Sequence, residues 1–420
     1  MFYPASESFR IATAETRGAS FVTINTERNM KKLITFALSL LISLSVLNNQ
    51  TLACTTFCLK NKGEVLFGKN YDWMIGDGLI FVNKRGVSKT ATSEAAPNPA
   101  KWVSKYGSVT FNQYGRENPS GGMNEAGLVI ELMWLDETVY PKEDSRPALG
   151  TLEWIQYQLD SSATVEEVIK NAENVRIASE VKLHYLVNDA NGNSATVEFL
   201  NGNLVARAGE KLAFSALAND TYEKSLNYAK TNAIEKAKSQ SSFDRFTRAS
   251  QKSAEFGKQS KTEKEAVGYA FDVLADVAQT GYTQWSIVYD QKRGKIYFRS
   301  QQSPAIKSID AKSFDYACGG VVKIFDLNSK ESGDVSAKFA NYTREANRNL
   351  IERSFNGTPF LKGIPAFFKD FAASYPENFI CEAKGQKAET QEMKEETDKT
   401  SFSYAYLAFP LYYFIKQIVS

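Results

Sequence analysis

The stretch CTTFCLKNKGEVLFGKNYDW, residues 54–73, decides how the folded body of the chain begins. Apolar and polar residues alternate on both sides of a turn near Asn61, which is the pattern of two half-buried strands. Successive side chains of a strand point to opposite faces, so Cys54, Thr56 and Cys58 share one face. Cys58 would lie about 13 Å beyond Cys54 at ~3.3 Å per residue. We therefore expect Cys58 to be a small buried core residue that takes no part in chemistry.

The segment that precedes Cys54 has the composition of an export signal. Two lysines follow Met30, residues 33–47 are apolar, and the residues just before Cys54 place small side chains where signal peptidase cuts. The apolar run is too short to span a membrane comfortably, which disfavours the alternative of an uncleaved anchor. We predict that residues 1–53 are a leader, with Met30 as the true start, and that Cys54 becomes the first residue of the exported protein.

The rest of the chain alternates hairpins with helical segments. Residues 182–202 predict a hairpin that turns at Asn191–Gly192, and residues 283–300 predict a second hairpin. Helix-period apolar positions run through residues 152–173, and residues 221–280 have a helical composition. Further strands are predicted at residues 79–86, 107–114 and 124–135. Antiparallel hairpin groups with helices between them favour a layered α+β body over a doubly wound parallel fold.

The composition indicates a large folded body without cofactor or nucleic-acid motifs. The 420 residues are 43% hydrophobic, which is ample for an extensive core. Removal of the leader leaves 45 basic and 45 acidic residues, and no basic block is present, so we expect no nucleic-acid partner. One histidine and four scattered cysteines give no metal-ligand spacing, and no glycine loop has the spacing that binds phosphate. We expect neither a metal nor a cofactor.

The C-terminal part of the chain carries the other two cysteines and a tail of different composition. Cys318 and Cys381 could form a disulfide in an exported protein. A dense charge run covers residues 384–399, and the last 20 residues are apolar and aromatic but contain a proline. We expect a folded domain over residues 54–383, followed by a tail at 384–420 that packs on the domain or is disordered. The tail is barely long enough for the alternative, a membrane anchor.

Cys54 is the strongest candidate for a nucleophile. The chain's one histidine, His184, alternates with apolar residues on a predicted strand and has no nucleophile motif nearby, so we expect it to be structural. An N-terminal cysteine needs no histidine, because its α-amine has a pKa just below that of its thiol and can take the thiol proton. Cleavage after Ala53 would supply that amine.

Seven motifs in a fixed order resemble those of the linear amide C–N hydrolases, the family of choloylglycine (bile salt) hydrolases and penicillin V acylases. The resemblance covers residues 54–300. The motifs are CTTFCLKNKGEVLFGKNYDW, NKRG, GGMNEAGLVIELMWL, HYLVNDANGNSATVEF, LANDTYEKSL, DRFTRA and TQWSIVYD. The resemblance implies an N-terminal-nucleophile hydrolase: an α+β fold that is a four-layer αββα sandwich with antiparallel sheets. It also implies hydrolysis of the linear amide bond of N-acyl substrates through an acyl-thioester.

The resemblance implies roles for individual residues. Cys54 would be the nucleophile and, through its amine, the general base, and Asp72 would bind and orient that amine. Asn219 would donate its side-chain amide to the oxyanion of the tetrahedral intermediate. Arg245 would lie beside the thiol and favour the thiolate.

Four further residues would line the substrate site: Lys69, Asn70, Trp73 and Trp134. Many members of the family carry arginine where this chain has Lys69, which keeps the charge but lacks the planar fork of a guanidinium. Bile salt hydrolases tend to carry Asn, and some penicillin acylases Tyr, at the position of Trp134. The pair of Trp73 and Trp134 resembles that of Gram-negative acylases, and two indoles suit an apolar acyl chain or a phenyl ring better than a sterol edge.

The implied protein is an exported bacterial enzyme, periplasmic or secreted, that meets a membrane only during export. Its partner would be a small N-acyl amide of the penicillin V, N-acyl homoserine lactone or conjugated bile acid type. The resemblance also implies a homo-oligomer, since many members are tetramers. Two alternatives are a cell-envelope lipoprotein with a lipidated Cys54 and a catalytically inactive member that binds a ligand. Against a lipoprotein, Thr51 replaces the usual leucine, and a strand follows Cys54 where a tether is usual.

Processing of the leader gives the first prediction. N-terminal sequencing and intact mass of the exported protein should show a free α-amine on Cys54, because the proposed base is that amine. A blocked or lipid-modified cysteine would contradict the amidase hypothesis.

Overall fold

The computed structural model describes residues 54–92, 98–258 and 261–382, and all of these belong to one structural unit. The predicted leader, its start at Met30 and the predicted tail from residue 384 lie outside the described residues. Within the described ranges, no helix is long and apolar enough to cross a membrane.

One of two large sheets contains the opening stretch. Its pairings are antiparallel except for the last, in which β17 and β19 run parallel. In spatial order its described strands are β14 (Ala216–Leu217), β1 (Thr55–Lys60), β2 (Val65–Asp72), β15 (Thr283–Asp290), β16 (Lys295–Ser300), β17 (Lys307–Asp310) and β19 (Gly333–Asp334). The predicted strand pair of residues 54–73 is thus the hairpin β1–β2, in which Thr55 faces Asn70. Gly68 allows the close pairing, because a Cβ there would lie 2.3 Å from the Phe57 ring.

The second large sheet is antiparallel throughout its described pairings. In spatial order its strands are β13 (Asn203–Ala208), β12 (Ser194–Leu200), β11 (Leu183–Asn188), β8 (Val129–Trp134), β7 (Gly121–Asn124), β6 (Ser108–Asn112), β3 (Leu79–Asn83), β18 (Lys323–Asp326) and β20 (Ala340–Asn341). Both predicted hairpins are confirmed, as β11–β12 and β15–β16. Gly192 takes a φ of 74° in the first turn, as the Asn-Gly pair predicts.

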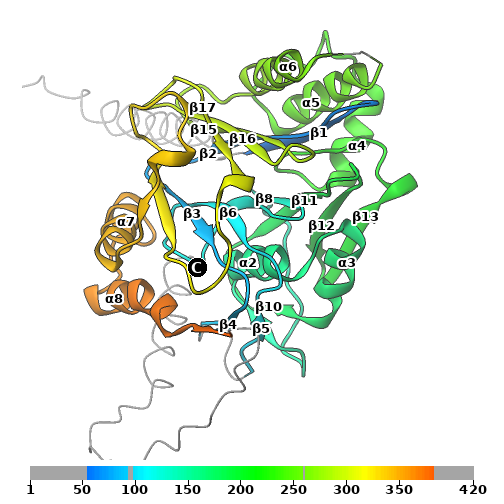
Figure 1. Ribbon diagram of the computed structural model, residues 1–420. Coiled ribbons are helices and arrows are strands. Elements are labelled where there is room, and N and C mark those ends of the chain that lie inside the picture. Colours follow the sequence, from blue (N-terminus) through cyan, green and yellow to red (C-terminus); the bar gives the residue numbers. More distant parts are fainter. Residues whose placement is uncertain (1–53, 93–97, 259–260, 383–420) are drawn as a thin grey trace, which may run out of the picture. The chain divides into compact units, whose positions relative to one another are not determined.

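Helices cover the outer faces of the two sheets (Figure 1). α5 (Ser242–Phe256) and α6 (Glu263–Asp276) pack on β1, β2 and β15, while α2 (Thr151–Ser161) and α3 (Val165–Asn174) pack on the second sheet. α4 (Tyr222–Thr231) packs against α5. The order helix, sheet, sheet, helix is the expected four-layer α+β sandwich, so the fold prediction is confirmed. The apolar inner faces of both sheets form one continuous core.

The helix-period apolar positions of residues 152–173 belong to two helices, α2 and α3. α2 ends at Ser161, and the backbone N–H of the following residue, Ser162, donates to the Gln158 carbonyl. Thr164 then caps α3, because its side chain accepts a hydrogen bond from the Glu167 backbone N–H. Ser and Thr compete for backbone hydrogen bonds, which explains why the chain breaks here although the apolar positions continue.

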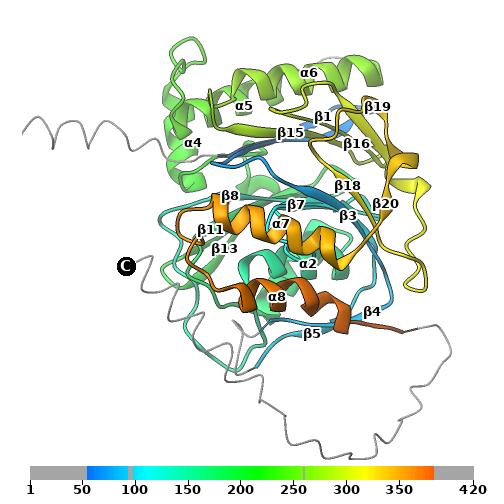
Figure 2. The same cartoon turned by 90° about the vertical axis from the view of Figure 1, so that its left-hand side faces the viewer.

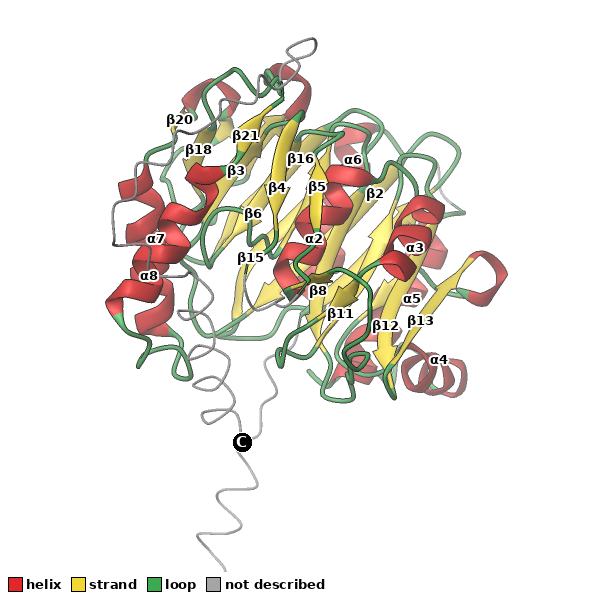
Figure 3. Ribbon diagram, turned by 90° about the horizontal axis from the view of Figure 1, so that it is seen from below, coloured by secondary structure: helices red, strands yellow, loops and turns green. Residues whose placement is uncertain are grey.

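The C-terminal part adds elements for which the sequence patterns made no prediction. α7 (Arg344–Gly357) and α8 (Ala366–Ser374) lie together beside the sheets (Figures 1 and 2). A small sheet joins β21 (Ile380–Cys381), β4 (Val87–Thr90) and β5 (Lys101–Val103), and Figure 3 shows β4 and β5 on the face that carries α2. A further short pair joins β9 (Ala148–Leu149) and β10 (Arg176–Ile177). Short 3₁₀ turns occupy Gly209–Lys211, Ala311–Ser313, Ser336–Lys338 and Tyr375–Asn378.

The four cysteines fall into two pairs of different character. Cys318 and Cys381 form a disulfide, as the sequence allowed, and this bond ties β21 to the loop before β18. Cys54 and Cys58 are free and buried. Cys58 is 6% exposed within the core, as expected for a small packing residue.

Candidate active site

Cys54 lies at the edge of the core, immediately before β1. The antiparallel pairing of β1 with β2 brings it to the end of β2, where its Sγ lies 3.9 Å from the Asp72 carbonyl oxygen. The residue is only 4% exposed. Burial raises the pKa of the Cys54 thiol, and the nearby Lys69 ammonium partly offsets that rise. The sulfur therefore remains a neutral thiol until a base removes its proton.

The Arg245 guanidinium connects three segments of the chain around Cys54. It is fully buried on α5, and its Nη1 donates to the Cys54 carbonyl at 2.9 Å and to the Thr55 hydroxyl. Its Nη2 donates to Asn219 Oδ1 at 3.0 Å. The family resemblance implied that Arg245 lies beside the thiol. In the structure, its guanidinium donates hydrogen bonds to the backbone carbonyl of Cys54 and to the Asn219 amide oxygen. The group thus fixes the positions of both residues.

Asp72 ends β2 and points toward the same guanidinium. Its Oδ1 accepts a hydrogen bond from the Thr283 hydroxyl at 2.5 Å, and its Oδ2 lies 4.0 Å from Arg245 Nη1. Burial raises the pKa of the Asp72 carboxyl to about 6, although Arg245 and Thr283 act to lower it. Oδ2 is buried and accepts no hydrogen bond from the described residues. A buried carboxylate oxygen without a hydrogen bond can accept one from a donor placed beside it.

Asn219 follows the short strand β14 and is held by its side-chain amide. Oδ1 accepts from Arg245, and Nδ2 donates to the Trp134 carbonyl at 2.9 Å. Its backbone N–H donates to the Ser242 hydroxyl at 2.8 Å. An amide nitrogen carries two hydrogens, so one N–H of Asn219 is left for a further acceptor.

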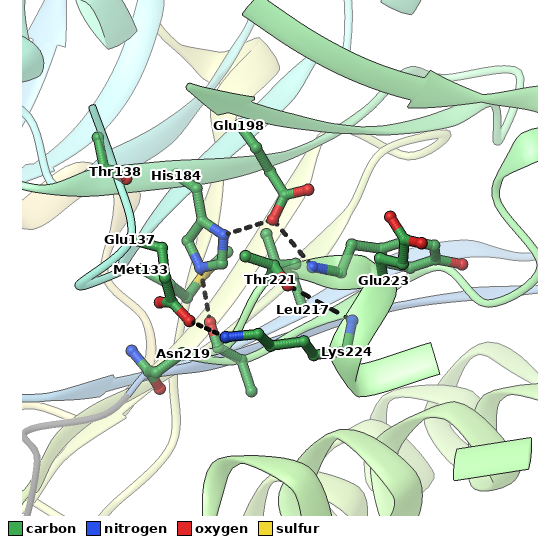
Figure 4. Close-up of polar contacts among 12 residues, drawn as sticks. Met133, Glu137, Thr138, His184, Glu198, Leu217, Asn219, Thr221, Glu223 and Lys224 are labelled. Atoms are coloured by element: carbon green, nitrogen blue, oxygen red, sulfur yellow. Dashed lines mark hydrogen bonds and ion pairs between the residues drawn. The ribbon is translucent and has the colours of Figure 1, made fainter. Parts of the chain in front are cut away.

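His184 lies close to Asn219, and its two ring nitrogens contact Glu198 and the Ala218 carbonyl (Figure 4). It is fully buried on β11, and its Nε2 lies 2.8 Å from the carbonyl of Ala218, the residue before Asn219. A carbonyl only accepts, so Nε2 carries the hydrogen. On the other side of the ring, Nδ1 lies 3.4 Å from Glu198 Oε1. This buried position agrees with the structural role expected for His184, because the ring supports the backbone that presents Asn219.

Lys69 lies in the core between the two sheets. Its Nζ donates to the Leu132 carbonyl and lies 3.8 Å from Glu131 Oε2 on β8. Burial raises the pKa of Glu131 to about 7, and the Tyr289 hydroxyl donates to its Oε1 at 2.6 Å. Glu131 was missed by the sequence analysis. The available signal was a carboxylate inside the apolar strand VIELMW, where it requires a buried partner.

Asn70 has a different place from the one predicted. Its Nδ2 donates to the Leu274 carbonyl at 2.7 Å, and its Oδ1 accepts from the Ser286 hydroxyl at 2.8 Å. These contacts fasten α6 and β15 to β2. Neighbouring residues of a strand point to opposite faces, so Asn70 faces the helices while Lys69 faces the second sheet. The structure does not group Asn70 with the residues that line the site.

Trp73 and Trp134 are adjacent at the rim of the site. Both are partly exposed, and their ring centroids lie 6.5 Å apart at 35°. Trp73 follows Asp72 directly, and the Trp134 carbonyl holds Asn219, so the pair adjoins both the thiol and the amide. The predicted tryptophan pair is therefore brought together with Cys54, Asp72, Asn219 and Arg245.

Comparisons with known proteins agree with this arrangement. Residues 54–243 match the sequence model of the linear amide C–N hydrolases, choloylglycine hydrolase family. The chain is 26% identical over 358 residues to the penicillin V acylase of Pectobacterium atrosepticum, across 73% of this chain and 94% of that protein.

Solved structures show the same relationship. The penicillin V acylase of Agrobacterium tumefaciens is 31% identical, with a TM-score of 0.62, over 69% of this chain and 98% of that one. A variant of conjugated bile acid hydrolase from Clostridium perfringens shares the fold at 19% identity and a TM-score of 0.56, over 66% and 98% of the two chains. The chain therefore belongs to the linear amide C–N hydrolases of the choloylglycine hydrolase family, and it is a hydrolase of carbon–nitrogen bonds in linear amides.

Proposed function

We propose that this protein is an exported N-acyl amide hydrolase in which Cys54 is the N-terminal nucleophile. The observation that carries the proposal is the buried Asp72 Oδ2, which accepts no hydrogen bond from the described residues and lies on the Cys54 side of the Arg245 guanidinium. Cleavage after Ala53 would create an α-amine next to this carboxylate. Asp72 would then hold the amine in place while it exchanges a proton with the thiol.

The reaction begins when the amine takes the thiol proton. The neutral, buried thiol of Cys54 is a poor nucleophile without this transfer. The thiolate attacks the amide carbon, and the resulting oxyanion receives the available N–H of Asn219. The ammonium then returns its proton to the leaving nitrogen, the C–N bond breaks, and an acyl-thioester remains. Water, deprotonated by the same amine, hydrolyses the thioester and restores the thiol.

Arg245 makes this geometry rigid, because one buried guanidinium fixes the carbonyl of the nucleophile and the side chain of the oxyanion donor. Oxyanion stabilisation depends on donors that are already aimed before charge develops. The role proposed for Arg245 is therefore to orient Cys54 and Asn219.

The disulfide supports the proposed export. The Cys318–Cys381 bond is stable in an oxidising compartment and would be reduced in most cytosols. We propose a periplasmic or secreted location on this ground and on the leader pattern.

For the substrate, the tryptophan pair favours an aromatic or apolar acyl group. Two partly exposed indoles beside Cys54 offer edges and faces that match a phenyl or phenoxy ring. Among N-acyl amides, we propose a penicillin V-like compound before an N-acyl homoserine lactone and before a conjugated bile acid. Relatives named as penicillin V acylases point the same way.

A hydrolysis screen tests the function. Purified mature protein should release phenoxyacetate from penicillin V faster than it cleaves N-acyl homoserine lactones or conjugated bile acids. Cys54→Ser should fold, as judged by circular dichroism and Tm, and lose turnover by at least about 10³-fold, because a hydroxyl is far less acidic than a thiol. Wild-type turnover by the Cys54→Ser variant would refute Cys54 as nucleophile.

Asn219 gives a second prediction. Asn219→Ala should lower kcat on the order of 10²–10³ with a small change in KM, because an oxyanion donor acts mainly in the transition state. Asn219→Asp, which has the same shape but no N–H, should be at least as slow. Retained turnover in Asn219→Asp would remove Asn219 from the oxyanion site.

His184 gives a third prediction, since it acts only through the backbone of Ala218. His184→Ala should lower kcat roughly five- to tenfold, the value of one lost hydrogen bond, and leave KM nearly unchanged. His184→Gln, which keeps a donor, should recover most of that loss. Lys224→Ala, which removes an exposed ion pair with Glu137 in the same region, is the matched control and should have no effect (Figure 4). A folded His184→Gln variant as inactive as Cys54→Ser would place the ring in the chemistry.

A further inference from the structure

The connection between α7 and α8 reaches the tryptophan pair from a part of the chain that the family's sequence model does not match. That match ends at residue 243, whereas α7 begins at Arg344. Figures 1 and 2 both place α7 and α8 side by side next to the sheets. We call residues 358–365, between these helices, the α7–α8 connection.

Phe360 of the α7–α8 connection packs on Trp73. The two ring centroids lie 6.4 Å apart at 82°, an edge-to-face arrangement. Trp134 lies 6.5 Å from Trp73, so Trp73 is the central member of an aromatic trio. All three rings are partly exposed and can therefore meet a ligand without any change of the core.

Two hydroxyl groups fix the connection in place. Trp73 Nε1 donates to the Tyr114 hydroxyl at 2.8 Å, and that hydroxyl lies 3.0 Å from Thr358 Oγ1. Next to this bridge, the Gly357 backbone packs closely against the Ile75 side chain, since a Cβ on Gly357 would lie 2.7 Å from Ile75 Cγ2. The position of Phe360 relative to Trp73 is thus set by hydrogen bonds and by close packing.

The trio adjoins the reacting groups. Trp73 follows Asp72, whose carbonyl oxygen lies 3.9 Å from Cys54 Sγ, and the Trp134 carbonyl accepts from Asn219 Nδ2. An acyl group whose carbonyl carbon meets Cys54 and whose oxygen meets Asn219 would extend along these rings.

We propose that Phe360 is a specificity-determining residue that, with Trp73 and Trp134, receives the aromatic ring of the acyl group. This inference rests on the proposed function and assigns one part of acyl recognition to the C-terminal part of the chain. Three aromatic rings without a charged member favour a phenyl or phenoxy group, which makes edge-to-face contacts, over a flexible alkyl chain, which does not.

The test compares Phe360→Ala with Phe367→Ala. Phe367 lies on α8, is 49% exposed, and has Phe368 as its aromatic neighbour, so it is a matched control. Steady-state constants are measured for penicillin V and for an N-hexanoyl homoserine lactone. Calorimetry gives the Kd of phenoxyacetate and of hexanoate, a readout that needs no turnover.

Phe360→Ala should raise KM for penicillin V and Kd for phenoxyacetate about three- to tenfold, with kcat within about twofold, because it removes a contact made in both ground and transition states. The hexanoyl compounds should change less than about twofold, and Phe367→Ala should match the wild type. Tyr114→Phe, which removes the hydroxyl bridge but keeps the ring, should shift the same constants in the same direction by a smaller factor.

The outcomes separate the two proposals. If penicillin V is hydrolysed and Phe360→Ala behaves like Phe367→Ala, the role of Phe360 is overturned and the function stands. If no amide is hydrolysed but phenoxyacetate binds in a Phe360-dependent way, the acyl site stands and the proposed function fails. If phenoxyacetate neither binds nor is released, both are overturned.

Discussion

The buried Arg245 guanidinium is the interaction on which the site depends. Its hydrogen bonds reach the Cys54 carbonyl, the Thr55 hydroxyl and the Asn219 amide oxygen, which belong to chain segments far apart in the sequence. A buried cation is costly unless its donors are satisfied and an opposite charge is near, and Asp72 supplies that charge at 4.0 Å. The free-energy cost of burying Arg245 and Asp72 is offset only when the Cys54, Thr55 and Asn219 acceptors are also in place. The positions of Cys54 and Asn219 are therefore fixed by the hydrogen bonds of one buried guanidinium.

The four-layer fold makes this arrangement possible. In the first large sheet, Asp72 ends β2 and Cys54 directly precedes the neighbouring strand β1. α5 presents Arg245 from the outer layer, and β8 of the second sheet carries Trp134. His184 supports the Ala218 carbonyl from the second sheet and Arg245 binds the Asn219 amide, so Asn219 is held from two sides. Each layer thus contributes a different function, and none of them could build the site alone.

Local signals in the sequence predicted the structure best. The strands of residues 54–73, both hairpins and the buried character of Cys58 follow from alternation and turn residues, and the structure confirms them. Long-range contacts were not predictable in the same way. The contact of Asn70 with α6, the pairing of Lys69 with Glu131 and the position of α7 and α8 depend on packing between segments that no local pattern relates.

The sequence by itself determined the strand pattern that begins at Cys54, the order of the motifs and hence the family to which the chain belongs. Only the tertiary structure decided which groups meet: that Arg245 holds a carbonyl and an amide, that Asp72 keeps one oxygen without a hydrogen bond among the described residues, and that Phe360 joins the tryptophans. The physical reason is that alternation and turn preferences act over a few residues, whereas burial of charge and packing of rings are settled only when distant segments come together.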